Sequence, residues 1–255
     1  MSLAEQLAGM KSRRENKQNS VILAKVTNIE DPESLGRVKC RPLTDNPKVK
    51  DTDWCYVMTP AGGSEYGFFF FPQLDDLVLL SYIGGDVHRP MVLGSFWAGE
   101  TVAPYKIEGG ENKVISLKTP TGSELKFEEE ENQQKITITT PSGAVIKIDD
   151  KDKTMTLQGN DDNSLTINWK DGEIELKAAA KLTLSAGDTT ITLESSGNLT
   201  GKASQKVNFE GANLELKGSM DFKAKGAQAE IKADGQLSLE SSGITKLKGS
   251  LVQIN

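Results

Sequence analysis

The sequence predicts an all-β protein with two unlike parts, an N-terminal barrel followed by a C-terminal rod. The first observation is a repeat: from about Thr154 onward, apolar residues two positions apart recur roughly every eight residues. Residues two apart lie on one face of a β-strand, so each unit predicts one strand and one turn. The second observation is composition, because seven of nine prolines and eleven of fifteen aromatic residues fall in the first 105 residues. We therefore place the boundary near residue 105.

Residues 20–105 carry the alternation and the turn residues of a small barrel of antiparallel strands. The predicted strands cover residues 21–26, 37–41, 54–58, 77–82 and 91–96. About five strands in a domain of this size are typical of an OB-type barrel. Two cysteines, Cys40 and Cys55, are too few for a disulfide framework, and we interpret them as buried free thiols.

Four consecutive phenylalanines, Phe68, Phe69, Phe70 and Phe71, end at Pro72. In a strand, Phe68 and Phe70 would point to one face, and Phe69 and Phe71 to the other. One pair would then fill the barrel and the other would be exposed unless something covers it. Two interpretations stay open: a contact with another protein or subunit, or a strand that is buried on both faces.

The barrel region also carries short motifs with a familiar order. They are Gly67–Pro72, Asp75–Leu79, Gly84–Asp86, Arg89–Pro90 and Val92–Ser95. Together they resemble the OB-fold module of central spike proteins of contractile injection systems: phage baseplate assembly protein V, the phage-tail lysozyme spikes and the VgrG proteins of type VI secretion. Residues 74–76 and 87–88 depart from the usual pattern, but both are turn positions. The resemblance implies a C-terminal β-helix made by three intertwined chains.

Residues 106–150 are predicted to be linker hairpins that open the β-helix, and residues 151–255 to be the β-helix itself. Thr119–Gly122 recurs as Thr140–Gly143, and each copy precedes two alternating segments joined by an acidic turn. The run Glu128–Glu131 is interpreted as a solvated hairpin tip rather than a cation site, because adjacent residues do not converge on one ion.

The short repeat predicts a homotrimer. A single-chain solenoid needs about 20 or more residues per coil to enclose a core. A unit of about eight residues supplies only one strand and a turn, whereas three chains can each supply one face of a triangular prism. Apolar residues would point inward, charged residues would point outward, and the strand edges would be paired.

Composition disfavours several other classes of protein. The net charge of −6 argues against a general nucleic-acid surface. The only histidine, His88, lies in a Gly-Asp-x-x-Arg-Pro turn, so we expect no catalytic residue, no cofactor and no metal site. There is no apolar run of membrane-spanning length and no N-terminal secretion signal. We expect the chain to be assembled in the bacterial cytoplasm.

The resemblance implies partners at both ends of the spike. No histidine follows His88, so the His-x-His metal apex of some phage spikes cannot form. We expect the partly apolar C-terminal end, with residues Leu251, Val252, Ile254 and Asn255, to dock a PAAR-type tip protein.

At the other end, residues 1–19 are expected to form a tail or a short helix. They place Leu3, Leu7 and Met10 at helical spacing before a basic stretch. VgrG proteins begin with a large hub that is not found here, so a separate trimeric hub protein is expected to hold the chain. The phenylalanine run Phe68–Phe71 is the candidate contact with the hub or between subunits.

These inferences predict a non-enzymatic central spike located in the baseplate of a virion or injection particle. It would contact baseplate and tube proteins, transmit the force of contraction and puncture the target envelope, touching the target membrane only transiently. The alternative is a carbohydrate-binding or carbohydrate-active β-helix protein with an OB-type binding barrel. A nucleic-acid-binding barrel is disfavoured because basic residues are not interleaved with the aromatic ones.

Overall fold

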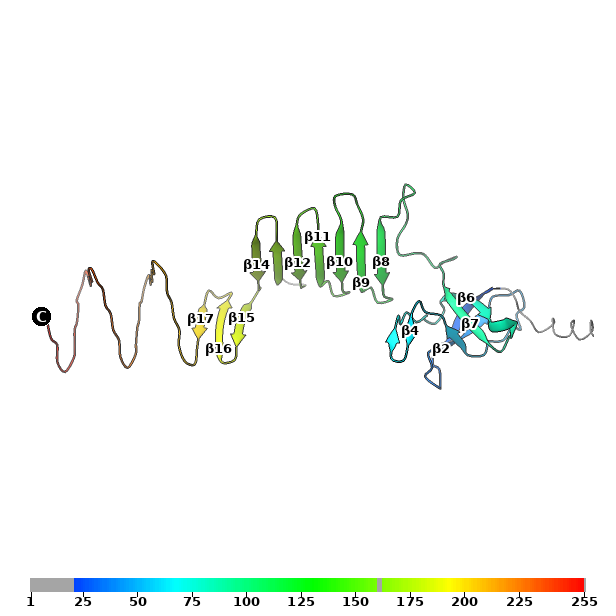
Figure 1. Cartoon of the computed structure of the whole chain (residues 1–255), viewed down its shortest axis with the longest axis horizontal. Helices are drawn as coiled ribbons and strands as arrows, with labels where there is room; N and C mark the ends of the chain where they lie inside the picture. The colour runs from blue at the N-terminus through cyan, green and yellow to red at the C-terminus, as the bar shows by residue number, and fades with distance from the viewer. Residues whose placement is uncertain (1–20, 160–161, 255) are drawn as a thin grey trace, which may run out of the picture. The chain divides into compact units, whose positions relative to one another are not determined.

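The computed structural model describes residues 21–159 and 162–254 of the 255-residue chain. Contacts divide the chain into two compact units, one ending at Ala179 and one beginning at Ala180. In the described residues the regular elements are β-strands and one 3-10 turn, Ile83–Gly85 (Figure 1). The predicted all-β class is confirmed. The expected N-terminal tail or helix at 1–19 lies outside the described residues.

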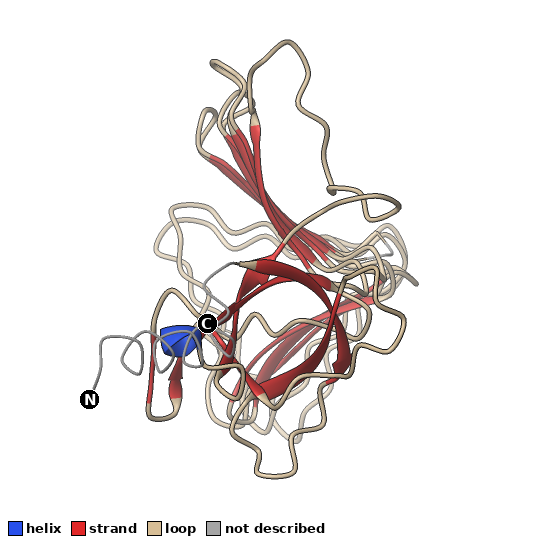
Figure 2. Ribbon diagram, turned by 90° about the vertical axis from the view of Figure 1, so that its right-hand side faces the viewer, coloured by secondary structure: helices blue, strands red, loops and turns tan. Residues whose placement is uncertain are grey.

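Five strands close into a barrel in the order β1-β2-β3-β7-β6, seen as a ring in Figure 2. They are β1 (Ile22–Asn28), β2 (Arg37–Pro42), β3 (Cys55–Val57), β6 (Leu77–Tyr82) and β7 (Pro90–Ser95). Each coincides with a predicted strand to within about two residues. The expectation of wholly antiparallel pairing is wrong at one place, because β3 runs parallel to β7, with Tyr56 opposite Met91.

Small and medium-sized side chains fill the barrel because alternate residues of each strand point inward. The core consists of Ala24, Val26, Val38, Cys40, Cys55, Val78, Leu80 and Val92. Cys40 and Cys55 are both free and buried, which confirms their predicted state. The neighbouring Cys55 thiol and burial together raise the pKa of Cys40.

A short hairpin precedes the phenylalanine run. Its strands are β4 (Gly62–Gly63) and β5 (Tyr66–Gly67). The Tyr66 ring lies so close to Gly63 that a Cβ atom there would be 2.3 Å from it. The strand arrangement considered for residues 68–71 is wrong: these residues belong to no strand, and the pairing of the hairpin ends at Gly67.

A seven-stranded antiparallel sheet follows, in which each strand pairs with the next one along the chain. The strands are β8 (Val114–Lys118), β9 (Glu124–Glu128), β10 (Lys135–Thr139), β11 (Val145–Asp149), β12 (Thr154–Gln158), β13 (Ser164–Asn168) and β14 (Glu173–Lys177). The duplicated turns have the same geometry. Gly122 has φ +95° and Gly143 has φ +89°, and their amides donate to the carbonyls of Thr119 and Thr140.

The unit that begins at Ala180 contains a three-stranded antiparallel sheet. Its strands are β15 (Lys181–Ala186), β16 (Thr189–Glu194) and β17 (Leu199–Lys202). Residues 203–254 form no strand, and Figure 1 shows them as an extended trace that repeatedly reverses direction. The strands that the repeat predicts in this stretch are therefore absent from the described single chain, which offers them no neighbouring strand to pair with.

Candidate functional site

The seven-stranded sheet presents one face on which two complete rows of residues are apolar. The strand register places seven residues in each row, one from every strand. Because the rows are two residues apart along each strand, they share a face. The first row is Ile115, Phe127, Ile136, Ile148, Met155, Ile167 and Ile174; the second is Leu117, Leu125, Ile138, Ile146, Leu157, Leu165 and Leu176.

The row between them points to the opposite face and is polar throughout. Its members are Ser116, Lys126, Thr137, Lys147, Thr156, Thr166 and Glu175. A sheet with one apolar and one polar face normally packs its apolar side on a core. The sequence of β8–β14 is therefore typical of a sheet whose apolar face is covered by a second layer of protein.

The apolar face is exposed to solvent in the single chain. Ile115 is 59% exposed and Ile174 is 73% exposed, and several side chains between them are more than a third exposed. A shallow cavity of about 440 Å³ opens on this face, lined mainly by aliphatic side chains that include Ile146, Leu157 and Leu165. An unbroken apolar face across seven strands indicates a protein–protein interface.

The polar face holds a buried carboxylate. Asp149 is 1% exposed and lies 3.3 Å from Lys147 Nζ and 3.5 Å from Lys135 Nζ. It also accepts a hydrogen bond from the Asp152 amide. Burial by itself raises the pKa of Asp149, but the Asp152 amide and the two lysines outweigh it, so the pKa is lowered. The carboxylate therefore stays charged and ties β10 and β11 together.

The same pattern continues in the smaller sheet. Its register aligns Leu182, Leu193 and Leu199 in one row and Leu184 with Ile191 in a second. Threonines at positions 183, 192 and 200 form the row on the opposite face. The unit that begins at Ala180 thus also presents an uncovered apolar face.

The C-terminal segment exposes its apolar side chains even more fully. Among the described residues, no hydrogen bond between two backbone groups involves positions 203–254. Of the residues expected to dock a tip protein, Leu251, Val252 and Ile254 are exposed, Ile254 to 88%. Asn255 lies outside the described residues. An alternating apolar segment without any backbone partner is incomplete as a single chain, because strands in water need neighbouring strands for stability.

The phenylalanine run forms an aromatic patch at the barrel. Phe68 stacks on Phe70 with ring centroids 6.0 Å apart, and Phe69 stacks on Phe71 at 5.5 Å. Only Phe71 packs against the barrel core, while Phe69 is 82% exposed. The expectation that one whole pair fills the barrel is therefore wrong, because small residues already fill the core. Three of the four rings remain on the surface.

The aromatic patch lines a groove of about 990 Å³. The opposite wall is the loop that joins β1 to β2, residues 29–36, and the hairpin β4–β5 closes one side. Every charged side chain that lines the groove is acidic: Glu30, Asp31 and Glu65. The groove is thus an apolar channel with an acidic rim, which we call the aromatic groove.

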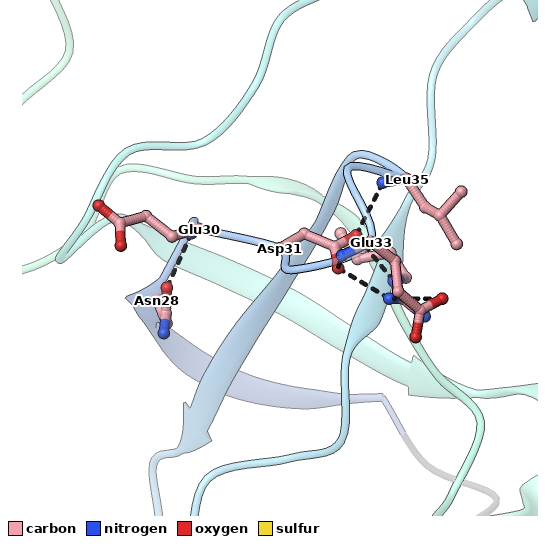
Figure 3. A network of polar contacts seen from close by, with 6 residues as sticks. Asn28, Glu30, Asp31, Glu33 and Leu35 are labelled. Atoms are coloured by element: carbon pink, nitrogen blue, oxygen red, sulfur yellow. Dashed lines mark hydrogen bonds and ion pairs between the residues drawn. The ribbon is translucent and has the colours of Figure 1, made fainter.

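A hydrogen-bond network fixes the β1–β2 loop (Figure 3). The Asp31 carboxylate accepts from the amides of Glu33 and Leu35, and its two oxygens accept from Arg37 at 2.8 and 2.7 Å. The Arg37 guanidinium holds the pKa of Asp31 well below its usual range. Because Asp31 is paired, the free negative charge at the groove belongs to Glu30 and Glu65.

The single histidine lies in an exposed ion pair. His88 Nδ1 is 2.9 Å from Asp53 Oδ2, and this hydrogen bond raises the pKa of His88. Within the described ranges, no group of three or more His, Cys, Asp or Glu side chains could hold a metal ion. Nor does any helix in the described part of the chain have the length and apolar character needed to cross a membrane.

Comparison with known proteins identifies the barrel. Residues 22–97 match the family model of the type VI secretion system/phage-baseplate injector OB domain, so the five-stranded barrel is an OB domain of this injector class. The chain is also VgrG-like, as its barrel motifs predicted.

Three relatives illustrate the similarity. The chain is 25% identical over 146 residues, 54% of this chain, to the actin cross-linking toxin VgrG1 of Vibrio cholerae O395. It is 27% identical over 114 residues, 42% of this chain, to the type VI secretion system spike protein VgrG3 of V. cholerae N16961. It is 30% identical over 116 residues, also 42%, to the spike protein VgrG5 of Pseudomonas aeruginosa PAO1. The matches span only 13%, 11% and 14% of the relatives' own lengths.

The sequence interpretation missed how far the apolar pattern extends. It began the repeat at Thr154, but the two apolar rows begin at Ile115 and Leu117 in β8. The signal was present as pairs two residues apart, such as Leu125 with Phe127. The apolar pairs of residues 106–150 were assigned to separate linker hairpins, so their continuity with the later strands in one sheet was missed.

Proposed function

We propose that this chain is the structural central spike of a contractile injection device and that it works as a homotrimer. The observation that carries the proposal is the apolar face of β8–β14, fourteen apolar side chains in two unbroken rows. The injector OB domain and the similarity to VgrG spike proteins support the same conclusion.

Three copies of the sheet satisfy the requirements of this face. Each copy supplies one side of a triangular prism, with its apolar rows inside and its lysines, threonines and glutamates outside. Full burial of an aliphatic side chain contributes about 1.5–3 kcal/mol, so covering the half-exposed rows contributes on the order of 1 kcal/mol per side chain. In the same assembly, residues 203–254 find strand partners in the neighbouring copies and complete the intertwined β-helix.

The mechanical role follows from this construction. In the trimer no strand of the rod can detach without exposing the apolar interior of all three faces, so the rod resists bending and local unfolding. Sheath contraction drives the tube forward, and the stiff spike transmits that force and breaches the target envelope. Contact with the target membrane is transient, and no catalytic step is involved.

The remaining partners are assigned to the exposed apolar surfaces. The aromatic patch, Phe68 to Phe71, contacts a trimeric hub protein or a neighbouring subunit. The exposed Leu251, Val252 and Ile254, together with Asn255, form the docking surface for a PAAR-type tip protein. The spike is assembled in the bacterial cytoplasm and resides in the baseplate of the virion or injection particle, beside baseplate and tube proteins.

Complementation in the producing cell tests the function. Cells that lack this chain are expected to release particles that cannot kill or inject, and the wild-type chain restores activity. A variant with Ile138→Asp and Ile146→Asp, which places charges on the apolar face, is expected not to restore it. A variant with Thr156→Asp and Thr166→Asp, which places two charges opposite each other on the polar face of β12 and β13, is the matched control. Full activity of the apolar-face variant would contradict the proposed role.

A further inference from the structure

We propose that the aromatic groove is an intramolecular docking site and that its occupant is the N-terminal segment of this chain, residues 3–17. The groove lies beside the β1–β2 loop and is lined by exposed aromatic and aliphatic side chains. Residues 1–20 lie outside the described residues, so the proposal rests on their sequence and on the chemistry of the groove.

The first argument is charge. No lysine or arginine lines the groove, and Asp31 is neutralised by Arg37, so Glu30 and Glu65 supply its free charge. Among the described residues neither Glu30 nor Glu65 has an ion-pair partner within 4 Å. The groove therefore favours a basic occupant, since opposite charges steer and select a partner.

The N-terminal segment has the matching composition. Residues 1–20 contain four cations, Lys11, Arg13, Arg14 and Lys17, against two carboxylates, which gives a net charge of +2 in a chain whose total is −6. The cations directly follow the apolar residues Leu3, Leu7 and Met10. This combination of apolar anchors with an adjacent basic cluster complements an apolar groove with an acidic rim.

The segment is also long enough to reach the groove of its own barrel. The groove wall begins at Ile29, directly after β1, a strand of seven residues. At about 3.3 Å per residue, β1 spans about 23 Å. Residues 11–21 alone, fully extended, reach about 36 Å. The chain that precedes β1 can therefore run back along the strand and place residues 3–10 in the aromatic groove, while the outermost ring, Phe69, stays available to a hub or a neighbouring subunit.

Amide hydrogen exchange of residues 61–71 in the full-length protein tests the proposal. A chain with Leu7→Ser and Met10→Ser, and a second with Arg13→Glu and Arg14→Glu, are each expected to exchange about tenfold faster there than wild type. A third chain with Lys48→Glu and Lys50→Glu makes the same change in net charge at exposed positions outside the groove, and is expected to match wild type.

A charge swap separates docking from simple structural damage. Glu30→Lys with Glu65→Lys is expected to accelerate exchange in the same way, and adding Arg13→Glu with Arg14→Glu to that chain is expected to restore slow exchange. The proposal is overturned if residues 61–71 exchange equally in wild type and in the Leu7→Ser, Met10→Ser chain, or if the charge swap fails to restore protection. A neighbouring subunit would also cover the aromatic patch, so the mass of each chain in solution is measured beside its exchange, and exchange is compared only between chains of equal mass.

Discussion

Replacing Leu157 by aspartate probes the apolar face at its centre. Leu157 belongs to β12, with Ile146 opposite it on β11 and Leu165 opposite it on β13. It is 40% exposed in the single chain, and this remaining surface is what the trimer would bury. The matched control is Thr156→Asp, which introduces the same charge one residue away on the polar face.

The magnitude follows from burial and charge. Loss of the remaining leucine burial costs on the order of 1 kcal/mol, from about 1.5–3 kcal/mol for a whole side chain. A carboxylate forced into an apolar interior costs several kcal/mol more. A total of about 4 kcal/mol corresponds to about a thousandfold in the association constant. Threefold symmetry repeats this cost in every subunit, whereas the Thr156→Asp change on a solvated surface stays within about 0.5 kcal/mol.

Light scattering coupled to size-exclusion chromatography measures the outcome at micromolar protein concentration. The Leu157→Asp chain is expected to elute as a monomer, while Thr156→Asp keeps the wild-type mass. Circular dichroism of both variants checks that the strands remain. If Leu157→Asp retains the wild-type mass, the apolar face does not lie inside an assembly, and the reasoning from the two rows fails.

Three further results are expected at the barrel. Phe71→Ser lowers the free energy of unfolding by about 2–3 kcal/mol because Phe71 packs on the core. Phe69→Ser leaves the thermal unfolding of the barrel unchanged but weakens the contact with a hub or a subunit. Equal melting temperatures for the two variants would refute this difference. Because the pKa of Asp31 is lowered, its ion pair contributes stability above the unfolded pKa of about 3.9 and loses it as the pH falls through the lower folded value. Asp31→Asn should therefore flatten the acid limb of stability against pH. The Asp53 pair raises the pKa of His88, so its contribution is present below about pH 6.5 and is lost as the pH rises through the raised value. In an NMR titration, Asp53→Asn should lower that pKa, and an unchanged value would contradict the pairing.

The barrel was predictable because its signals are local. Strict alternation along residues 37–41 identified β2, and the apolar run in residues 77–82 identified β6; both strands bury alternate residues inside the same domain. The phenylalanine run was not predictable in the same way. Alternation of four equal residues does not show which face is buried, and of the four rings only that of Phe71 packs against the core.

The rod shows a different limit of sequence interpretation. From β8 to β14 each strand pairs with the next one along the chain. The alternation of apolar residues therefore indicates each strand and the face that it presents. The turn lengths set the spacing of these pairs, but the spacing does not show that successive hairpins pair with one another in one sheet. The pattern at residues 203–254 is as regular as in the sheets, but no strand forms there in the single chain. In the proposed trimer, the strands that pair with this segment belong to the neighbouring copies of the chain, and the sequence of one chain does not reveal that pairing.

The mass of the wild-type protein in solution tests the central claim most directly. The chain has a mass of 27.6 kDa, so the proposed trimer has a mass of about 83 kDa, three times that value. Sedimentation equilibrium at micromolar concentration is expected to give the trimer mass, and unboiled samples are expected to resist dissociation by SDS. A single well-folded species of 27.6 kDa, stable across the concentration range, would show that the apolar face needs no second copy and would contradict the account.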